Sequence, residues 1–215
     1  MPNLPVILIG YSGHAYVVAG ILESMGKKVI AYCDQIEKLQ NPFNLTYLGT
    51  ETEEKAQVHF MNSYYFICIG DNMIRQKVFQ RLVIEGGIKL PINAIHKSTS
   101  IHRTVEIENG CVMIAAGVVI NPLAYISKGV ICNTSCVIEH ECRVGAFAHI
   151  APGAVLCGNV TIGENTFVGA NSVVKQGINI GKNVIIGAGS VVIDDIEDNS
   201  CLVGNPGKII KQKIK

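Results

Sequence analysis

Residues 114–192 read IAAGVVINPLAYISKGVICNTSCVIEHECRVGAFAHIAPGAVLCGNVTIGENTFVGANSVVKQGINIGKNVIIGAGSVV, and the spacing of their apolar residues predicts the fold. Every sixth residue from Ile114 to Val192 is apolar, without exception. A period of 3.6 would indicate an amphipathic helix and a period of two a half-buried strand, so neither explains a period of six. Hexapeptide repeats are instead typical of a parallel β-helix.

Each repeat also has a small or β-branched residue four places after the apolar one, from Val118 to Ser190. We therefore predict a chain wound as a triangular prism, with one hexapeptide per side and about eighteen residues per coil. Glycines that directly follow the apolar residues, such as Gly145 and Gly163, are expected to form the corners with positive φ. A sandwich of short strands would instead show turn signals every 8–12 residues.

The composition limits the range of partners. The 215 residues carry a net charge of +1, from 18 basic and 17 acidic residues, and 48% are hydrophobic. This allows a substantial core in one or two domains, and it makes a nucleic acid or an anionic membrane an unexpected partner. Because the sequence shows no signal peptide and no apolar run of membrane-spanning length, we expect a cytoplasmic protein.

The eight cysteines allow two interpretations. Cys132 falls on a core position of the repeat, and Cys136 and Cys142 fall on small positions, so we expect reduced cysteines that pack in the interior. The alternative is a zinc site formed by Cys136, His140 and Cys142, although their spacing does not match a C-x2-C pair. The first interpretation implies no metal.

Residues 1–92 are expected to form a Rossmann-like α/β domain that precedes a β-helix domain at residues 93–215. An apolar strand at residues 6–9 ends in the turn GYSGH at residues 10–14, and a helical pattern follows. The turn matches neither G-x-G-x-x-G nor G-x-S-x-G, so neither the dinucleotide fingerprint nor the hydrolase elbow is present. What remains is a loop whose N–H groups could hold a phosphate, or a simple tight turn.

Two further strands, at residues 29–32 and 64–69, complete the expected sheet. The first ends near Asp34, which could accept hydrogen bonds from a ribose or base, and the second is followed by the turn and N-cap Gly70-Asp71 and a helix. Between them, residues 37–63 indicate little beyond a short helix near residues 51–57. Because two strand–glycine–helix units create a crevice at the carboxyl ends of their strands, we expect a nucleotide there.

His140 is the residue of the repeat best suited to acid–base chemistry. It lies two places after the core residue Ile138, so its side chain points out of the prism, between Glu139 and Glu141. Neighbouring carboxylates raise the basicity of an imidazole and orient it, which suits a general base, although a surface histidine alone is commonplace. Gly158 lies eighteen residues later, one coil above, where its N–H could stabilise an oxyanion.

A second histidine points to a shared site. His149 is nine residues from His140, half a coil away on another side of the prism, and it is also expected to point outward. The two cannot easily meet within one chain. We therefore predict a trimer in which the site lies between subunits.

The segments NTSCVIEHEC at 133–142, HIAPG at 149–153 and CGNVTIG at 157–163 resemble the hexapeptide acyltransferases that acetylate nucleotide-linked amino sugars. The resemblance covers nearly the whole chain, including GYSGH at 10–14, IGDNMIR at 69–75 and GNP at 204–206. The sequence is most similar to the bacterial UDP-4-amino-sugar N-acetyltransferases of the bacillosamine type. The GDP-perosamine N-acetyltransferases and the sialic acid O-acetyltransferase group are similar relatives.

The resemblance implies a homotrimer of left-handed β-helices in a bacterial glycan pathway, with acetyl-coenzyme A as donor and no metal. The implied acceptor is a UDP-linked 4-amino-4,6-dideoxy sugar, with GDP-perosamine as the next choice. Many UDP-binding relatives have two consecutive acids where this sequence has Asp34-Gln35, which leaves the base open. His140 would deprotonate the sugar amine, Glu141 would raise its basicity, and the N–H of Gly158 would meet the thioester carbonyl.

Further site residues are implied by the same resemblance. The acetyl donor would contact His149, Gly158 and the backbone at Ala170 and Ala188. The nucleotide sugar would contact Ser12, Gly13, His14, Asp34, Gly70, Asp71 and Asn133. Three alternatives remain: a sugar O-acetyltransferase, a metal-dependent hydratase on the same β-helix, and a nucleotide-binding module without activity.

Overall fold

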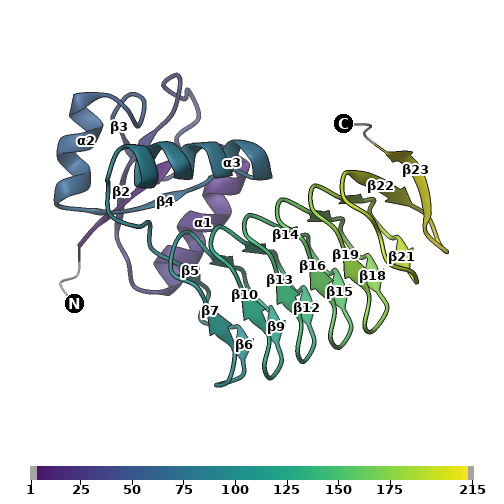
Figure 1. Cartoon of the computed structure of the whole chain (residues 1–215). Coiled ribbons are helices and arrows are strands. Elements are labelled where there is room, and N and C mark those ends of the chain that lie inside the picture. Colours follow the sequence, from purple (N-terminus) through teal and green to yellow (C-terminus); the bar gives the residue numbers. More distant parts are fainter. Residues whose placement is uncertain (1–3, 213–215) are drawn as a thin grey trace.

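The computed structural model describes residues 4–212 and shows a small α/β domain packed against the first coils of a long parallel β-helix (Figure 1). The α/β domain contains a four-stranded parallel sheet in the order β3-β2-β1-β4. Its elements are β1 (Val6–Ile9), α1 (Gly13–Ser24), β2 (Val29–Cys33), β3 (Thr46–Tyr47), α2 (Glu54–Met61), β4 (Tyr64–Ile67), α3 (Asn72–Phe79) and the π-helix η1 (Gln80–Glu85), which continues α3.

The predicted strands and helices of this domain are present, with one omission. The expected strands correspond to β1, β2 and β4, and the helix near residues 51–57 is α2, which begins at Glu54. The two-residue strand β3 was not predicted, because it lies in a segment without hydrophobic periodicity. Glu53 is the N-cap residue of α2, and its carboxylate accepts a hydrogen bond of 2.8 Å from the N–H of Thr50 in the preceding turn.

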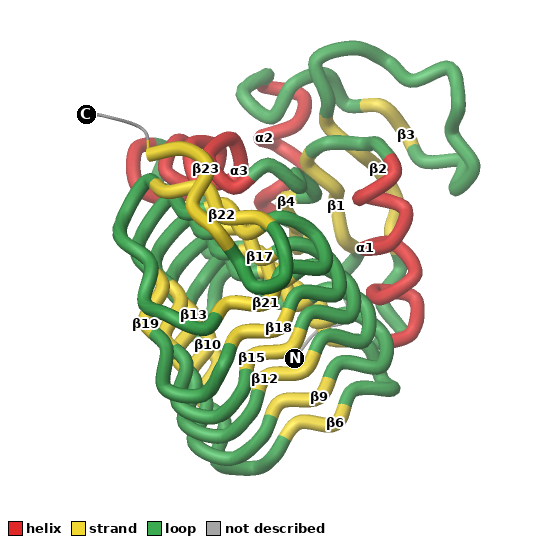
Figure 2. Tube along the Cα trace, turned by 90° about the vertical axis from the view of Figure 1, so that its right-hand side faces the viewer, coloured by secondary structure: helices red, strands yellow, loops and turns green. Residues whose placement is uncertain are grey.

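The β-helix is built from two-residue strands that form three parallel sheets, and paired residues are eighteen positions apart along most of its length. Figure 2, turned by 90° from Figure 1, shows the coils stacked behind one another. The strands are β5 (Ala94–Ile95), β6 (Ser100–Ile101), β7 (Glu106–Ile107), β8 (Met113–Ile114), β9 (Val119–Ile120), β10 (Tyr125–Ile126), β11 (Ile131–Cys132), β12 (Val137–Ile138), β13 (Arg143–Val144), β14 (His149–Ile150), β15 (Val155–Leu156), β16 (Thr161–Ile162), β17 (Phe167–Val168), β18 (Val173–Val174), β19 (Asn179–Ile180), β20 (Ile185–Ile186) and β21 (Val191–Val192).

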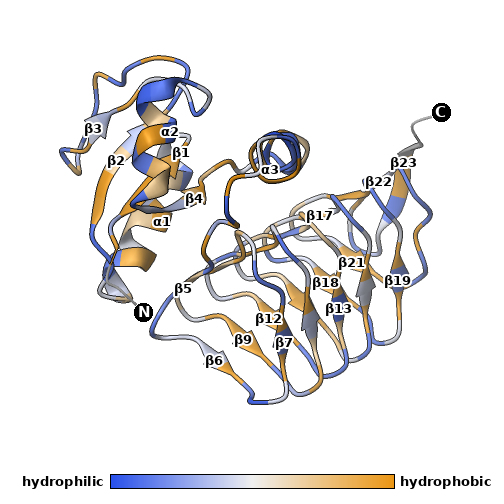
Figure 3. Ribbon diagram, turned by 60° about the vertical axis from the view of Figure 1, so that its left-hand side comes forward, coloured by the Kyte–Doolittle hydropathy of each residue, from blue (hydrophilic) through white to orange (hydrophobic). Residues whose placement is uncertain are grey.

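The hexapeptide register predicted from the sequence is confirmed. Every sixth residue from Ile114 to Val192 is at most 2% exposed, so these side chains form the interior of the prism. The positions four places later are buried as well, including the polar residues Thr166, Ser172 and Ser190. Figure 3 shows the hydrophobic colour on many of the strands and the hydrophilic colour on many of the turns between them.

The corners turn at a different residue from the one predicted. Positive φ occurs three places after each core residue from Ile114 to Ile186, as at Ser135, Glu141 and Asn165, whereas Gly145 and Gly163 do not have it. A Cβ on Gly145 would lie 2.8 Å from the carbonyl oxygen of Ile162 in the next coil. The prediction of positive φ at these glycines was therefore wrong: their small size allows neighbouring coils to approach closely.

The first coils contain one extra residue, between β7 and β8. Here Gly110 and Cys111 both have positive φ. The thiol of Cys111 lies 3.4 Å from the backbone nitrogen of Ile67, and a Cβ on Gly110 would meet the ring of Phe79. The extra residue thus fits the prism against the α/β domain.

Arg75 of α3 joins the two domains although it is only 1% exposed. Its guanidinium donates hydrogen bonds to the carbonyl oxygens of Gly129 (2.9 Å) and Phe147 (2.7 Å) on the prism. It also donates to the carbonyls of Ile69 and Gly70 in the loop before α3, at 2.9 and 3.0 Å. One buried side chain therefore fixes this loop relative to the β-helix.

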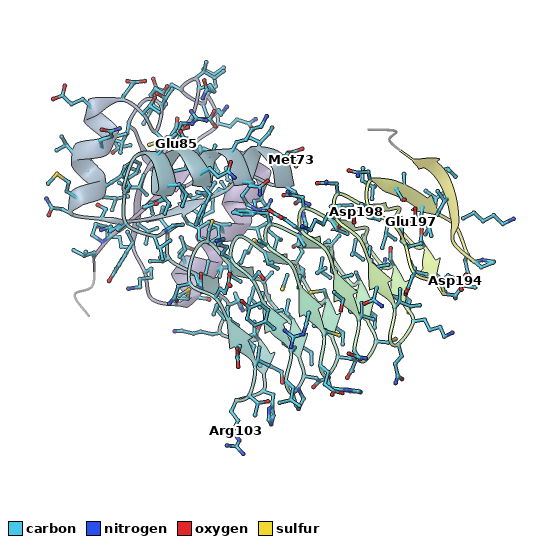
Figure 4. All side chains as sticks on the ribbon, in the orientation of Figure 1. Met73, Glu85, Arg103, Asp194, Glu197 and Asp198 are labelled. Carbon is cyan, nitrogen blue, oxygen red and sulfur yellow. The ribbon has the colours of Figure 1, made fainter. Side chains whose placement is uncertain are left out.

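A hairpin closes the far end of the prism. It consists of β22 (Ser200–Val203), which continues one sheet, and β23 (Lys208–Gln212), which pairs with it in antiparallel fashion. Asp194, Glu197 and Asp198 lie at this end (Figure 4). The carboxylate of Asp198 accepts a hydrogen bond of 2.7 Å from the N–H of Lys182. The cap predicted from residue 202 onward is present, and it covers an otherwise open sheet edge.

Candidate active site

A cleft of about 310 Å³ opens at the carboxyl ends of β1, β2 and β4, where the sequence predicts a nucleotide. Gly10 forms its floor with φ +85°, and a Cβ there would lie 3.3 Å from the carbonyl oxygen of Cys68. Ser12 and Gly13 are exposed beside it. Ser12 is the N-cap of α1, but its side chain makes no capping hydrogen bond, so its hydroxyl can face a ligand. The cleft is lined by Ile9, Gly10, Tyr11, Ser12, Cys33, Asp34, Gln35, Glu51, Cys68, Ile69, Gly70, Ile74, Val78 and Arg81.

Asp34 lies in the cleft, but its carboxylate is engaged by the protein. One oxygen accepts the N–H of Tyr11 at 2.9 Å. The other accepts the N–H of Gln35 at 2.7 Å and lies 3.2 Å from the ammonium of Lys38. Asp34 therefore braces the turn after β1 against the loop after β2.

Gly70 and Asp71 form the turn between β4 and α3. The carboxylate of Asp71 accepts a hydrogen bond of 2.9 Å from the N–H of Ile74, so it caps α3 as predicted. The carbonyl of Gly70 is held by Arg75 at 3.0 Å. This arrangement leaves Gly70 half-buried at the mouth of the cleft.

His14, Asn133 and His149 are brought together where the α/β domain meets the prism. The rings of His14 and His149 have centroids 6.5 Å apart, and the amide nitrogen of Asn133 lies 3.1 Å from Nε2 of His149. His149 points out of the prism as predicted, but the α/β domain covers it and it is only 8% exposed. Within residues 4–212, His14 Nε2 and His149 Nδ1 are buried and have no hydrogen-bond partner.

Both of these histidines are held in the neutral form. Burial lowers the pKa of His14 to about 4, and the charge of Arg75 acts in the same direction. Burial also lowers the pKa of His149 to about 3, with further contributions from Arg75 and His14. Each uncharged ring thus keeps one buried nitrogen that makes no hydrogen bond within residues 4–212.

His140, Glu141 and Gly158 form a second group on another part of the prism. Nδ1 of His140 lies 3.1 Å from a carboxylate oxygen of Glu141, and both side chains are about half exposed, at 51% and 56%. A Cβ on Gly158 would lie 2.5 Å from Cε1 of His140, so the imidazole rests directly over this glycine. Glu139, the other acidic neighbour, instead accepts a hydrogen bond from the side chain of Asn121 at 2.9 Å.

Several backbone N–H groups at the corners remain available. Among the described residues, the N–H groups of Gly158, Ala170 and Ala188 donate no backbone hydrogen bond. Ala170 and Ala188 lie one coil apart, since they follow β17 and β20 of one sheet, whereas Gly158 follows β15 of another. The structure therefore stacks the two alanines as predicted, on a different corner from His140 and Gly158.

Within one chain, the expected catalytic residue His140 and the expected donor-binding residue His149 lie apart. His140 belongs to the corner after β12, while His149 lies in β14 of a different sheet, beneath the α/β domain. No contact between the two histidines occurs in the part of the chain that the structure describes.

Sequence reasoning missed two residues of the cleft, Glu51 and Arg81. A guanidinium nitrogen of Arg81 lies 3.1 Å from a carboxylate oxygen of Glu51. Glu51 follows β3 in the segment without periodicity, and Arg81 lies in the first turn of the π-helix η1. No local motif links them, so the pairing becomes visible only when the sheet is assembled.

The remaining expectations concern cysteines, metals and membranes. All eight cysteines lack disulfide partners, and Cys132, Cys136 and Cys142 are buried in the prism. Residues 4–212 contain no group of three or more His, Cys, Asp or Glu side chains that could hold a metal ion. No helix among the described residues combines the length and apolar character needed to cross a bilayer.

Comparison with known families matches both parts of the chain. The model described as the PglD N-terminal domain matches residues 5–82, and the model described as the hexapeptide repeat of succinyl-transferase matches residues 159–193. A curated relative, the GDP-perosamine N-acetyltransferase of Escherichia coli O157:H7, is 28% identical over 117 residues. That alignment covers 54% of this chain and about half, 52%, of the relative.

Solved structures extend the similarity to nearly the full length. PerB from Caulobacter crescentus, in complex with CoA and GDP-perosamine, is 35% identical with a TM-score of 0.86, over 96% of this chain and 97% of PerB. The acetyltransferase domain of PglB from Neisseria gonorrhoeae is 29% identical with a TM-score of 0.88, over 97% of this chain and 100% of that domain. A second structure of that domain contains acetyl coenzyme A.

These matches confirm the predicted fold, a Rossmann-like α/β domain followed by a left-handed β-helix. They also confirm the resemblance drawn from the motifs around His140 and in the turn at residues 10–14. With 35% identity over almost all of PerB, the chain belongs to the family of hexapeptide-repeat N-acetyltransferases that act on nucleotide-linked amino sugars.

Proposed function

We propose that this protein transfers an acetyl group from acetyl-coenzyme A to the amine of a nucleotide-linked 4-amino-4,6-dideoxy sugar. The observation that carries the proposal is the imidazole of His140, paired with Glu141 and lying over Gly158. It occurs on a fold similar to that of PerB, whose structure contains CoA and GDP-perosamine. A cytoplasmic location, where the donor is available, is part of the proposal.

The geometry suits direct attack without an acyl-enzyme. Because Nδ1 of His140 faces the Glu141 carboxylate, it holds a proton there, and the Nε2 lone pair is directed to the substrate amine. As the amine nitrogen bonds to the thioester carbon, its proton passes to Nε2 and the carbonyl oxygen gains negative charge. The N–H of Gly158 stabilises that oxyanion, and its collapse breaks the C–S bond. The departing thiolate takes the proton from Nε2, which releases coenzyme A as the thiol and restores neutral His140.

The acetyl donor would lie along the corner that carries Ala170 and Ala188. Their N–H groups make no backbone hydrogen bond, so they can bind carbonyl oxygens of the pantetheine chain. In keeping with the family resemblance, His149 would lie at the acetyl end of the donor. No metal takes part in these steps.

The acceptor would be held by residues 1–92 and presented to residues 93–215 of a neighbouring subunit. Ser12, Gly13 and His14, at the start of α1, would contact the pyrophosphate and sugar, together with Gly70, Asp71 and Asn133. Asp34 would shape the loop around the base. Because His140 lies on a different side of the prism from this cleft, we propose a homotrimer with its sites between subunits.

The proposal is tested by thiol release from acetyl-coenzyme A, with GDP-perosamine and UDP-4-amino-4,6-dideoxy-N-acetylglucosamine as acceptors. The expected result is turnover with one of them, reduced by about 10²–10⁴ in His140→Ala, which is the usual contribution of a general base. His59→Ala is the matched control, because His59 is an exposed histidine of α2. Turnover only with sugars that lack an amine would identify an O-acetyltransferase instead.

A further inference from the structure

The cleft has an end that lies away from the prism. Glu51 follows β3, the edge strand farthest from β4 in the sheet, and Arg81 lies in η1. In Figure 4 the helix that carries Arg81 runs from Met73, near the coils, to Glu85, over the α/β domain. Ser12 and Gly70 line the opposite end of the same cleft, next to the prism.

Glu51 is a buried carboxylate with few partners. It is 4% exposed, and its only polar partner among the described residues is Arg81, whose Nη1 lies 3.1 Å from Oε1. Buried carboxylates normally accept several hydrogen bonds, so Oε2 has capacity for a donor from a ligand. The side chain of Arg81 is about half exposed, at 46%, and its guanidinium has five N–H donors, more than the contact with Glu51 uses.

The carboxylates of Glu51, Glu53 and Asp34 act on Cys33 at this end of the cleft. Burial raises the pKa of the Cys33 thiol to about 12, and the charges of Glu51, Glu53 and Asp34 act in the same direction. The start of α1, where backbone N–H groups lack helical partners, is the place that favours a pyrophosphate. A group that donates hydrogen bonds is the ligand that this end accommodates.

The proposed function sets the direction of the nucleotide sugar in the cleft. The sugar amine must reach an imidazole carried by a prism, so the sugar lies at the end near Ser12 and Gly70. The base then lies at the other end, against Glu51 and Arg81. This step rests on the proposed function.

We propose that Glu51 and Arg81 recognise a guanine base, so that the acceptor is GDP-linked. Guanine presents two adjacent donors, N1–H and the N2 amine, beside the acceptor O6. A carboxylate accepts from both donors while a guanidinium donates to O6. Uracil has one N–H between two carbonyl oxygens, and adenine presents a lone pair at N1. Either base would place an oxygen or nitrogen lone pair against the Glu51 carboxylate, which opposes binding.

The inference is tested by calorimetric titration of the intact protein with GDP, IDP and UDP, without acetyl-coenzyme A. IDP differs from GDP only by the missing N2 amine. Because a hydrogen bond to a charged group contributes about 10- to 100-fold, GDP should bind at least about tenfold more tightly than IDP. UDP should bind more weakly than both.

Two variants assign the contacts. Glu51→Gln should abolish the difference between GDP and IDP, because the amide cannot accept from both donors. Arg81→Gln should weaken both purine nucleotides equally, since both retain O6, and so preserve their ratio. Glu54→Gln, an exposed acid in the first turn of α2, is the matched control and should change neither value.

Tighter binding of UDP than of GDP would overturn the inference, as would a GDP to IDP ratio that survives Glu51→Gln. Thiol release with the UDP-linked sugar and not with GDP-perosamine would overturn it too, while leaving the acetyltransferase proposal intact. Conversely, selective GDP binding without any thiol release would support the guanine site and contradict the proposed reaction.

Discussion

His140 can lie over the next coil only because residue 158 has no side chain. The ring occupies the volume where a Cβ would be, 2.5 Å from Cε1, and this places the base beside a backbone N–H that makes no ladder bond. In the proposed mechanism, the glycine would therefore both position the imidazole and supply the oxyanion donor in the same corner.

Gly158→Ala should displace the imidazole without removing any functional group. Misplacing a catalytic group by about 1 Å costs on the order of 100-fold, so we expect kcat to fall by about 10- to 100-fold with little change in thermal stability. Steady-state thiol release measures this loss. Gly20→Ala, in an open position on α1 where a Cβ meets no atom within 4 Å, is the control. Equal kcat for Gly158→Ala and wild type would contradict the placement of His140.

His14 and His149 predict a pH dependence of stability. Their folded pKa values, about 4 and about 3, lie below the ordinary 6.5, so the unfolded chain binds more protons in acid. Their contribution is complete above pH 6.5 and is lost as the pH falls toward 4 and 3. We expect a loss of about 1–2 kcal/mol for each histidine between pH 7.5 and 5.

Urea denaturation of wild type and of His14→Asn/His149→Asn at these two pH values measures the effect. The double variant should lose less stability on acidification than wild type, because asparagine does not titrate. An identical loss in both proteins would show that the two rings are not held neutral by the fold.

For individual residues, the period of six predicted the contact between His140 and Gly158, because residues eighteen positions apart in a hexapeptide prism stack on each other. The burial of His149 could not be predicted, since the repeat indicates only that its side chain leaves the prism. What covers it depends on where the α/β domain packs, and Arg75 determines that through contacts with Gly129 and Phe147, which share no motif with it.

Among the elements, α3 contributes Arg75, which joins the two domains beside the candidate site. Arg75 buries a guanidinium against neutral acceptors only, four of them carbonyl oxygens and one the side-chain oxygen of Asn72. Burial lowers its pKa to about 10, so it stays charged at neutral pH. The loop at Gly70 and the corner at Phe147 are thereby held together.

Arg75→Met should destabilise the contact between the two domains, because several buried carbonyl oxygens would lose their hydrogen-bond donors. Each unsatisfied group costs about 1–3 kcal/mol, so we expect a total loss of at least about 3 kcal/mol in the free energy of unfolding. Urea denaturation measures it, with Lys77→Met, an exposed cation of the same helix, as the control. A loss below 1 kcal/mol would contradict the role assigned to Arg75.

The elements themselves differ in how well the sequence predicts them. The coils of the prism follow directly from a period of six, and the one slip, between Ile107 and Ile114, is visible as a break in that period. By contrast, β3 has two residues and no periodicity, so the loop that brings Glu51 into the cleft could not be predicted. The register of the repeat is specified many times over, because each coil repeats the same apolar spacing. The position of a short edge strand depends instead on a few tertiary contacts.

At the scale of the whole molecule, the candidate site residues lie on two separate surfaces of the chain. The group formed by His14, Asn133 and His149 lies where the domains meet, and His140 lies on another corner of the prism. The proposed reaction therefore requires a second copy of the chain to bring these surfaces together. The central claim is therefore a site that is assembled from two subunits.

Mixing inactive subunits tests this claim most directly. His140→Ala and the double variant His14→Ala/His149→Ala are each expected to be inactive, and each lacks a different half of the site. When they are unfolded together in equal amounts and refolded, random assortment should give about a quarter of the sites both intact halves. The account predicts that thiol release recovers to about a quarter of the wild-type rate. Activity that remains at the level of the separate variants would show that each chain contains its own complete site, and would contradict the shared one.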